Sequence, residues 1–126
     1  MPLTNKANRL KLKASTPIDQ EFNVWLEVGK YFTTDNMSLR LYTDDDGYSE
    51  CLATITCNFS DKEEPDVAYI DAISFPWIIR FINDNCLGYP TGKVQFSGYG
   101  IYPQYKFNLN EIKKYTYNYK GDSSYE

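Results

Sequence analysis

The sequence contains no histidine and only three cysteines, an odd number. Without histidine, the chain cannot form the serine–histidine or cysteine–histidine pairs that activate most nucleophiles, and it has no histidine general base. Cys51, Cys57 and Cys86 are not spaced as CxxC, so neither a disulfide framework nor a zinc site is predicted. The sequence therefore predicts a protein that is not an enzyme and that needs no cofactor or metal.

Long apolar runs are also missing. The first six residues contain no long apolar run, and the longest apolar stretch, near Trp77–Ile79, is far too short to span a bilayer. These features predict a cytoplasmic protein with reduced thiols and no membrane partner.

Aromatic residues, by contrast, are abundant. They make up 17% of the 126 residues, and twelve of them are tyrosines, which favour strands and half-wet surfaces. A chain of this length is expected to bury one hydrophobic core. We therefore expect a single domain rich in β-structure.

Alternation of apolar and polar residues predicts strands near residues 8–14, 37–43 and 51–57. The last two flank Asp44–Gly47, which indicates a β-hairpin. In its second arm, one face carries Cys51, Ala53, Ile55 and Cys57. The two cysteines on this face are expected to be small core residues.

A helix is predicted over residues 75–85, with Ser74 as its N-cap and a left-handed stop at Leu87–Gly88. Its core-facing stripe is expected to consist of Phe75, Ile78, Ile79 and Ile82. Trp77 and Phe81 lie off this stripe, so they are expected to provide aromatic surface.

The C-terminal third predicts a tight hairpin around Ser97–Gly100 and a short helix over residues 109–115 capped by Asn108. The predicted fold class is α+β: an antiparallel sheet of about five to seven strands packed against one main helix, with a short C-terminal helix. Residues 1–21 are expected to form an extension or edge strand, residues 22–117 the domain, and residues 118–126 a flexible tail.

Negative charge is concentrated in one part of the chain. Between Asp44 and Asp66 the sequence contains eight carboxylates and one lysine, Lys62, whereas the rest of the chain has nine acids and twelve bases. The eight are Asp44, Asp45, Asp46, Glu50, Asp61, Glu63, Glu64 and Asp66. They can be a solvated face that maintains solubility, a row that mimics phosphates, or, if they lie at opposite ends of a strand, an extended acidic edge.

One group of motifs suggests a relative. The pattern comprises Ala68–Asp71, Phe75–Trp77, Phe81–Ile82, Leu87–Gly88, Pro90–Gly92, Phe96–Tyr99 and Tyr102–Leu109. It resembles a small bacterial domain family of unknown function carried on conjugative elements, plasmids and phages. The likeness covers roughly residues 39–115 and is most specific over residues 90–109.

The resemblance implies a biological context and no catalytic chemistry. Small acidic proteins of mobile elements often antagonise host defence. It suggests a stoichiometric inhibitor, such as an anti-CRISPR protein that binds an effector nuclease in its basic nucleic-acid channel. The predicted contact residues are the eight carboxylates together with Trp77, Tyr99 and Tyr102. The segment Phe96–Tyr105 is an alternative binding surface.

Two other functions fit the same residues. One is an immunity or antitoxin-like protein that neutralises a basic toxin enzyme. The other is a single-stranded nucleic-acid binder that stacks bases on the tyrosines of the C-terminal third. The net charge of −4 argues against direct binding to nucleic acid.

Overall fold

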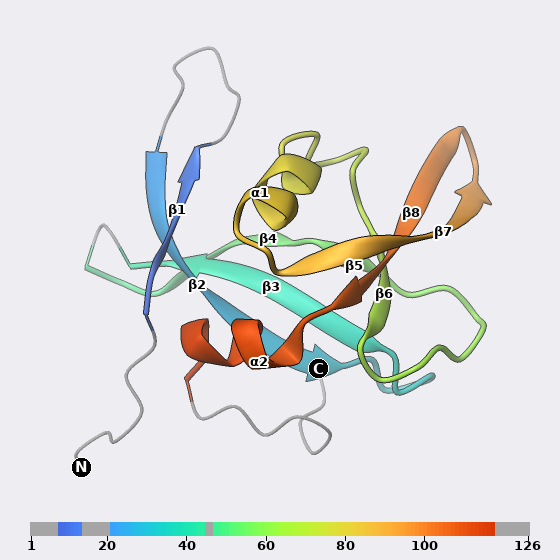
Figure 1. Ribbon diagram of the computed structural model, residues 1–126, viewed down its shortest axis with the longest axis horizontal. Helices are drawn as coiled ribbons and strands as arrows, with labels where there is room; N and C mark the ends of the chain where they lie inside the picture. The colour runs from blue at the N-terminus through green and yellow to red at the C-terminus, as the bar shows by residue number, and fades with distance from the viewer. Residues whose placement is uncertain (1–7, 14–20, 45–46, 118–126) are drawn as a thin grey trace.

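Two antiparallel four-stranded sheets and two short helices are seen in the computed structural model, which describes residues 8–13, 21–44 and 47–117 (Figure 1). The first sheet contains, in spatial order, β1 (Leu10–Lys13), β2 (Glu21–Lys30), β3 (Met37–Thr43) and β4 (Glu50–Thr54). The second contains β5 (Thr56–Cys57), β6 (Val67–Ile70), β8 (Gly100–Phe107) and β7 (Gly88–Ser97). The predicted antiparallel β-structure is confirmed, but the single sheet of five to seven strands is corrected to two sheets.

The two sheets are separate because the chain changes sheet at Ile55. The N–H of Ile55 donates to Leu39 O at 3.0 Å in the first sheet, and its carbonyl accepts from Asp71 N–H at 2.8 Å beside the second. The predicted strand over residues 51–57 is therefore divided into β4 and β5, although β3 and β4 pair as expected.

A β-bulge in β4 explains why Cys51 is exposed and not in the core. Leu41 pairs with Ala53 and Tyr42 pairs with Cys51, so Leu52 is the extra residue and the simple alternation breaks there. As a result Cys51 is exposed. Cys57 lies beyond the bulge, at the end of β5, and is half-buried, whereas Ile55 is fully buried. The prediction that both cysteines are core residues is wrong.

Helix α1 (Ile78–Asp84) is shorter than predicted. Ser74 does not cap it: the N–H of Ser74 donates to Asp71 Oδ1 at 3.0 Å, within a turn that precedes the helix. The left-handed residue after the helix is Cys86, with φ 55°, rather than Gly88. Phe81 is buried and not exposed as predicted, because the buried stripe runs through Ile78, Phe81 and Ile82 at i, i+3 and i+4.

The C-terminal helix is confirmed as α2 (Leu109–Ile112) followed by the 3-10 turn η1 (Lys113–Tyr115). The side chain of Asn108 accepts from Glu111 N–H at 3.2 Å, which is the expected N-cap bond. The core lies between the inner faces of the sheets and includes side chains of both helices, such as Ile82 and Ile112.

The N-terminal strand β1 lies at the edge of the first sheet, antiparallel to β2. Leu10 and Leu12 are buried in the core, whereas Lys11 between them is exposed, as expected for alternating residues of an edge strand. The predicted tail over residues 118–126 lies outside the described residues.

Candidate functional site

The two segments that carry the described acidic residues, the β3–β4 turn and the loop 58–66, lie at two ends of the molecule (Figure 1). Asp44 and Glu50 flank the β3–β4 turn, and the other four described carboxylates lie in the loop 58–66 after β5. The intervening segment from Glu50 to Cys57 spans about 25 Å at the usual rise of a strand. Asp45 and Asp46 lie outside the described residues. The carboxylates therefore do not form one continuous row.

Several of these carboxylates are engaged within the fold. Asp44 lies 2.8 Å from Arg9 Nη2, and Lys106 Nζ lies 3.2 Å from Asp66 Oδ2 and 3.7 Å from Glu64 Oε1. The Gln104 side chain donates to Glu63 Oε1 at 3.1 Å. Glu50, Asp61 and Glu64 are exposed, and of these three Glu64 is paired with Lys106. Glu50 and Asp61 are therefore the described carboxylates best placed to meet another molecule.

The three aromatic candidates also differ in their surroundings. Trp77 is half-buried beside Phe75, with ring centroids 5.5 Å apart, and packs against the core. Tyr102 is half-buried against Phe59 at 5.6 Å. Tyr99 is fully exposed in the turn between β7 and β8. Of the three, Tyr99 alone is displayed to solvent.

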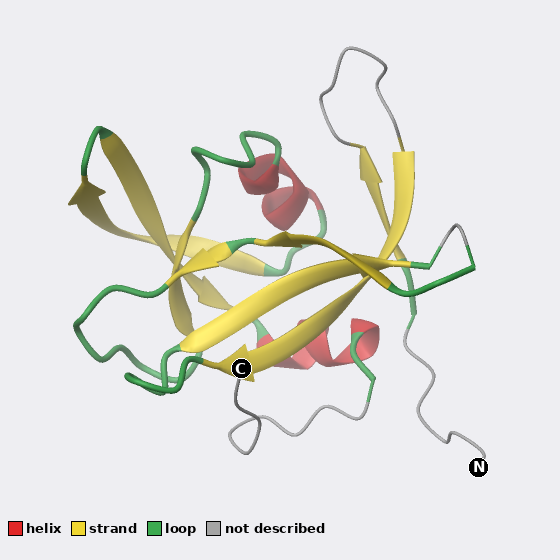
Figure 2. Cartoon of the chain, turned by 180° about the vertical axis from the view of Figure 1, so that it is seen from behind, coloured by secondary structure: helices red, strands yellow, loops and turns green. Residues whose placement is uncertain are grey.

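The β7–β8 hairpin projects from the body of the protein (Figure 2). Its strands are joined by the two residues Gly98 and Tyr99, and Gly98 has φ +60°, which suits the glycine position of a two-residue turn. β7 is the edge of the second sheet, and almost all of its residues are exposed. The hairpin is therefore accessible to solvent along its edge strand β7 and at its turn.

One face of this hairpin carries exposed apolar side chains. Phe96 pairs with Ile101, so both side chains lie on the same face as Val94, two residues before Phe96. The exposed fractions are 45% for Val94, 68% for Phe96 and 51% for Ile101. We call these three residues, with Tyr99 at the turn, the hairpin face.

The length of α1 explains why this face is uncovered. Ile101, Tyr105 and Phe107 alternate along the same face of β8, and burial increases away from the turn, because Tyr105 and Phe107 are in the core. Tyr105 also donates to Asn83 Oδ1 of α1 at 3.3 Å. A seven-residue helix is about 10 Å long, whereas an eight-residue strand spans about 26 Å. The helix therefore covers only the base of the hairpin.

The opposite face of the hairpin is covered by the acidic loop. Phe59 packs on Tyr102, and Glu63 accepts from Gln104. One apolar side chain on a surface is ordinary, whereas a cluster on a projecting element indicates an interaction site. The sequence identified these residues as strand formers, but alternation alone does not reveal which face is left uncovered.

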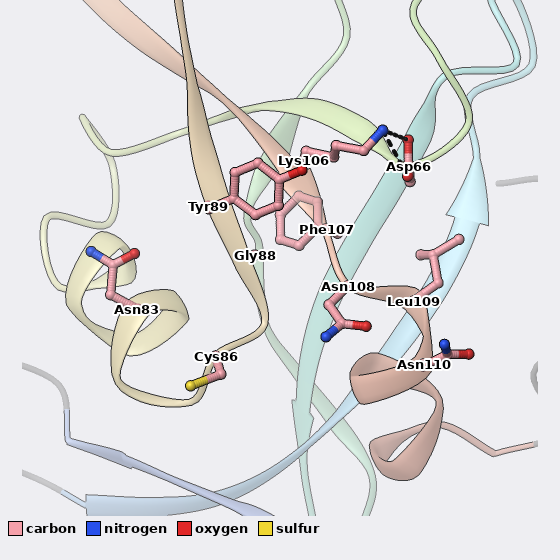
Figure 3. Close-up of a pocket in the computed structure, with 10 residues that line it drawn as sticks. All are labelled: Asp66, Asn83, Cys86, Gly88, Tyr89, Lys106, Phe107, Asn108, Leu109 and Asn110. Carbon is pink, nitrogen blue, oxygen red and sulfur yellow. Dashed lines mark hydrogen bonds and ion pairs between the residues drawn. The ribbon is translucent and has the colours of Figure 1, made fainter.

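A second feature is a groove of about 640 Å³ between α1, the base of the hairpin and α2 (Figure 3). Amide side chains of Asn83, Asn108 and Asn110 line it, and the ion pair of Lys106 with Asp66 lies on its wall. The hydrogen bond from Lys106 to Asp66 raises the pKa of the lysine. This lysine therefore stays charged and engaged with carboxylates of its own chain.

The described cysteines show neither an activated thiol nor a metal-ligand group. Burial raises the pKa of the Cys57 thiol to about 11, with the Asp71 carboxylate adding to the shift. A thiol with so high a pKa is a weak nucleophile. Within residues 8–13, 21–44 and 47–117, no three His, Cys, Asp or Glu side chains are grouped as metal ligands would be.

The chain matches the model of one known protein family. The model of a domain of unknown function, DUF4313, matches residues 25–122. The chain belongs to the DUF4313 family. The DUF4313 match begins inside β2 and includes the whole β7–β8 hairpin and both helices. No match to this DUF4313 chain was found among the curated proteins or among the solved structures.

The DUF4313 match agrees with the resemblance to a small family of unknown function drawn from the motifs between Ala68 and Leu109. The family description names no chemistry. None of the described helices has the length and apolar content required to cross a membrane.

Proposed function

We propose that this protein acts by binding a partner protein, and that the hairpin face is the main contact. The observation that supports it is the cluster of Val94, Phe96, Tyr99 and Ile101 on one projecting hairpin. A few well-packed side chains that leave water on binding, aromatic ones above all, supply most of the binding energy at protein interfaces. The fold already holds them in place, so little ordering is needed on binding.

Charge indicates the chemistry of the partner. The loop 58–66 lies against the other face of the hairpin, and within it the Asp61 carboxylate is exposed. The whole chain carries a net charge of −4. A partner with an apolar patch bordered by lysines or arginines would be attracted over long range and then anchored by the hairpin face.

The specific form of the proposal is a stoichiometric inhibitor of a host defence effector, such as a CRISPR effector nuclease. These nucleases hold nucleic acid in positively charged channels, which suit an acidic ligand. The divided carboxylates favour steering by charge and anchoring by the hairpin, rather than imitation of a phosphate row. An encoding mobile element is part of this proposal and is suggested by the motif resemblance.

The test compares partners captured from host lysate by three forms of the protein. They are the wild type, the double variant Phe96→Thr and Ile101→Thr, and the control Ile73→Thr, which changes another exposed isoleucine. We expect a basic protein that is retained by the wild type and the control and lost by the double variant. Equal capture by all three forms would exclude the hairpin face as the contact.

The identity of the captured protein then tests the specific form. A captured effector nuclease should be inhibited at about one equivalent of the protein in a cleavage assay. Replacement of Glu50 and Asp61 by Gln and Asn should slow association most at low salt, because steering weakens as ionic strength rises. Capture of a toxin enzyme instead would assign the immunity function, and an uninhibited nuclease would exclude the anti-CRISPR function.

A further inference from the structure

The free edge of β7 has two different halves. In the first half, Pro90 lacks an N–H, the register with β8 shifts between Pro90 and Val94, and Gly92 has φ +96°. The N–H of Lys93 donates to Thr91 Oγ1 at 3.2 Å. These features are the ones by which proteins prevent edge-to-edge pairing. The second half, Val94–Ser97, has no proline, no charge and no bulge.

The backbone groups of Val94 and Phe96 point away from β8. A two-residue turn is closed by a hydrogen-bonded pair, here Ser97 with Gly100, and such pairs alternate along the ladder. Phe96–Ile101 and Val94–Pro103 are then non-hydrogen-bonded pairs, which agrees with the missing N–H of Pro103. In agreement with this outward direction, the Gln95 side-chain amide donates to the Phe96 carbonyl oxygen at 3.4 Å. No strand among the described residues pairs with this edge.

We propose that this edge pairs with the same edge of a second copy of the chain, antiparallel and with its two-fold axis at Gln95. Gln95 then faces its own symmetry mate, and Val94 faces Phe96 of the other copy. The outward N–H and C=O groups of Val94 and Phe96 form four hydrogen bonds across the axis. Edge pairing of this kind is a common way to extend a sheet.

Side-chain chemistry favours a second copy as the occupant. Val94 and Phe96 of one copy lie beside Phe96 and Val94 of the other, on the face that also carries Ile101. The charged residue of the β7 edge, Lys93, falls opposite Ser97 and not opposite another lysine. The pairing also places two hairpin faces side by side on one continuous sheet. It does not depend on the proposed function.

Disulfide trapping tests the register directly. In a background with the exposed Cys51 and Cys86 replaced by serine, Gln95→Cys should form a covalent dimer on mild oxidation, because directly opposed Cβ atoms lie about 5 Å apart. The matched control Lys93→Cys should stay monomeric, since the two copies of residue 93 are about four residues apart along the strands. Absence of the Gln95→Cys dimer, or equal trapping of both variants, would overturn the proposal.

Sedimentation of the purified wild-type protein gives a second readout. We expect the mass to rise with concentration from 14.7 kDa to twice that value, and Phe96→Pro, which removes an outward N–H, to remain monomeric. A mass of 14.7 kDa at every concentration overturns the proposal. Because this measurement uses the protein alone, its failure leaves partner capture by the hairpin face as a separate result.

Discussion

Phe96 and Ile101 are cross-strand partners one step from the turn of the β7–β8 hairpin, and each is more than half exposed. Cross-strand apolar pairs of this kind normally face a core. Here helix α1 meets the hairpin near its base, where Tyr105 donates to Asn83. The pair is therefore held in strand geometry without being covered, as expected of a surface that meets another molecule.

The contribution of α1 to stability can be measured at Ile82, which is fully buried. We expect Ile82→Ala to lower the free energy of unfolding by about 2–5 kcal/mol, because it removes buried methyl groups and leaves a cavity. The exposed Ile73 provides the control, and Ile73→Ala should change this free energy by less than about 0.5 kcal/mol. Urea unfolding of both variants makes the comparison. Equal effects would contradict the docking of α1 on the core.

The N-cap of α2 gives a second prediction. Asn108→Ala removes the acceptor of the Glu111 N–H bond and should destabilise the protein by about 1 kcal/mol. Asn110→Ala, one residue inside the same helix and exposed, is the matched control and should be nearly neutral. Thermal unfolding monitored by circular dichroism distinguishes them. A neutral Asn108→Ala variant would be inconsistent with the observed cap.

The more buried a thiol is, the more slowly it should react. Cys51 and Cys86 are exposed, whereas Cys57 is half-buried and its pKa is raised to about 11. Since the thiolate is the reactive species, iodoacetamide at mildly alkaline pH should modify Cys51 and Cys86 well before Cys57. Mass spectrometry of the native protein follows the order, and denatured protein should react at all three positions. Early modification of Cys57 in the native state would contradict its position.

The elements that could be predicted from sequence are those with a local signal. The glycines Gly98 and Gly100 predict the β7–β8 turn, and the capping residue Asn108 predicts the short α2 helix. The change of sheet at Ile55 could not be predicted, because it depends on hydrogen bonds to Leu39 and Asp71, which lie far from it in the chain. A period of two residues is the same whether a strand continues in one sheet or enters another.

The candidate site was predicted in part, for a related reason. Charge counting identified an acidic stretch, but it could not show that the Asp44 end and the Asp66 end are separated by β4 and β5 or that both residues form internal ion pairs. The position of Tyr99 in a turn agrees with the hairpin that the sequence predicts around Ser97–Gly100. The exposure of Phe96 depends on where α1 ends in space, and this is set by tertiary packing.

Site-specific photo-crosslinking in host cells tests the hairpin face most directly. A photoreactive phenylalanine analogue placed at Tyr99 should give a discrete crosslinked species, and the additional changes Phe96→Thr and Ile101→Thr should remove it. If Phe96 and Ile101 are central contacts, their loss should cost about 2 kcal/mol, which is roughly a thirtyfold weaker Kd. The same analogue at the exposed Tyr48, on the β3–β4 turn, is the control. We expect crosslinking from position 99 and not from position 48, and crosslinking from position 48 alone would exclude the hairpin face as the main contact.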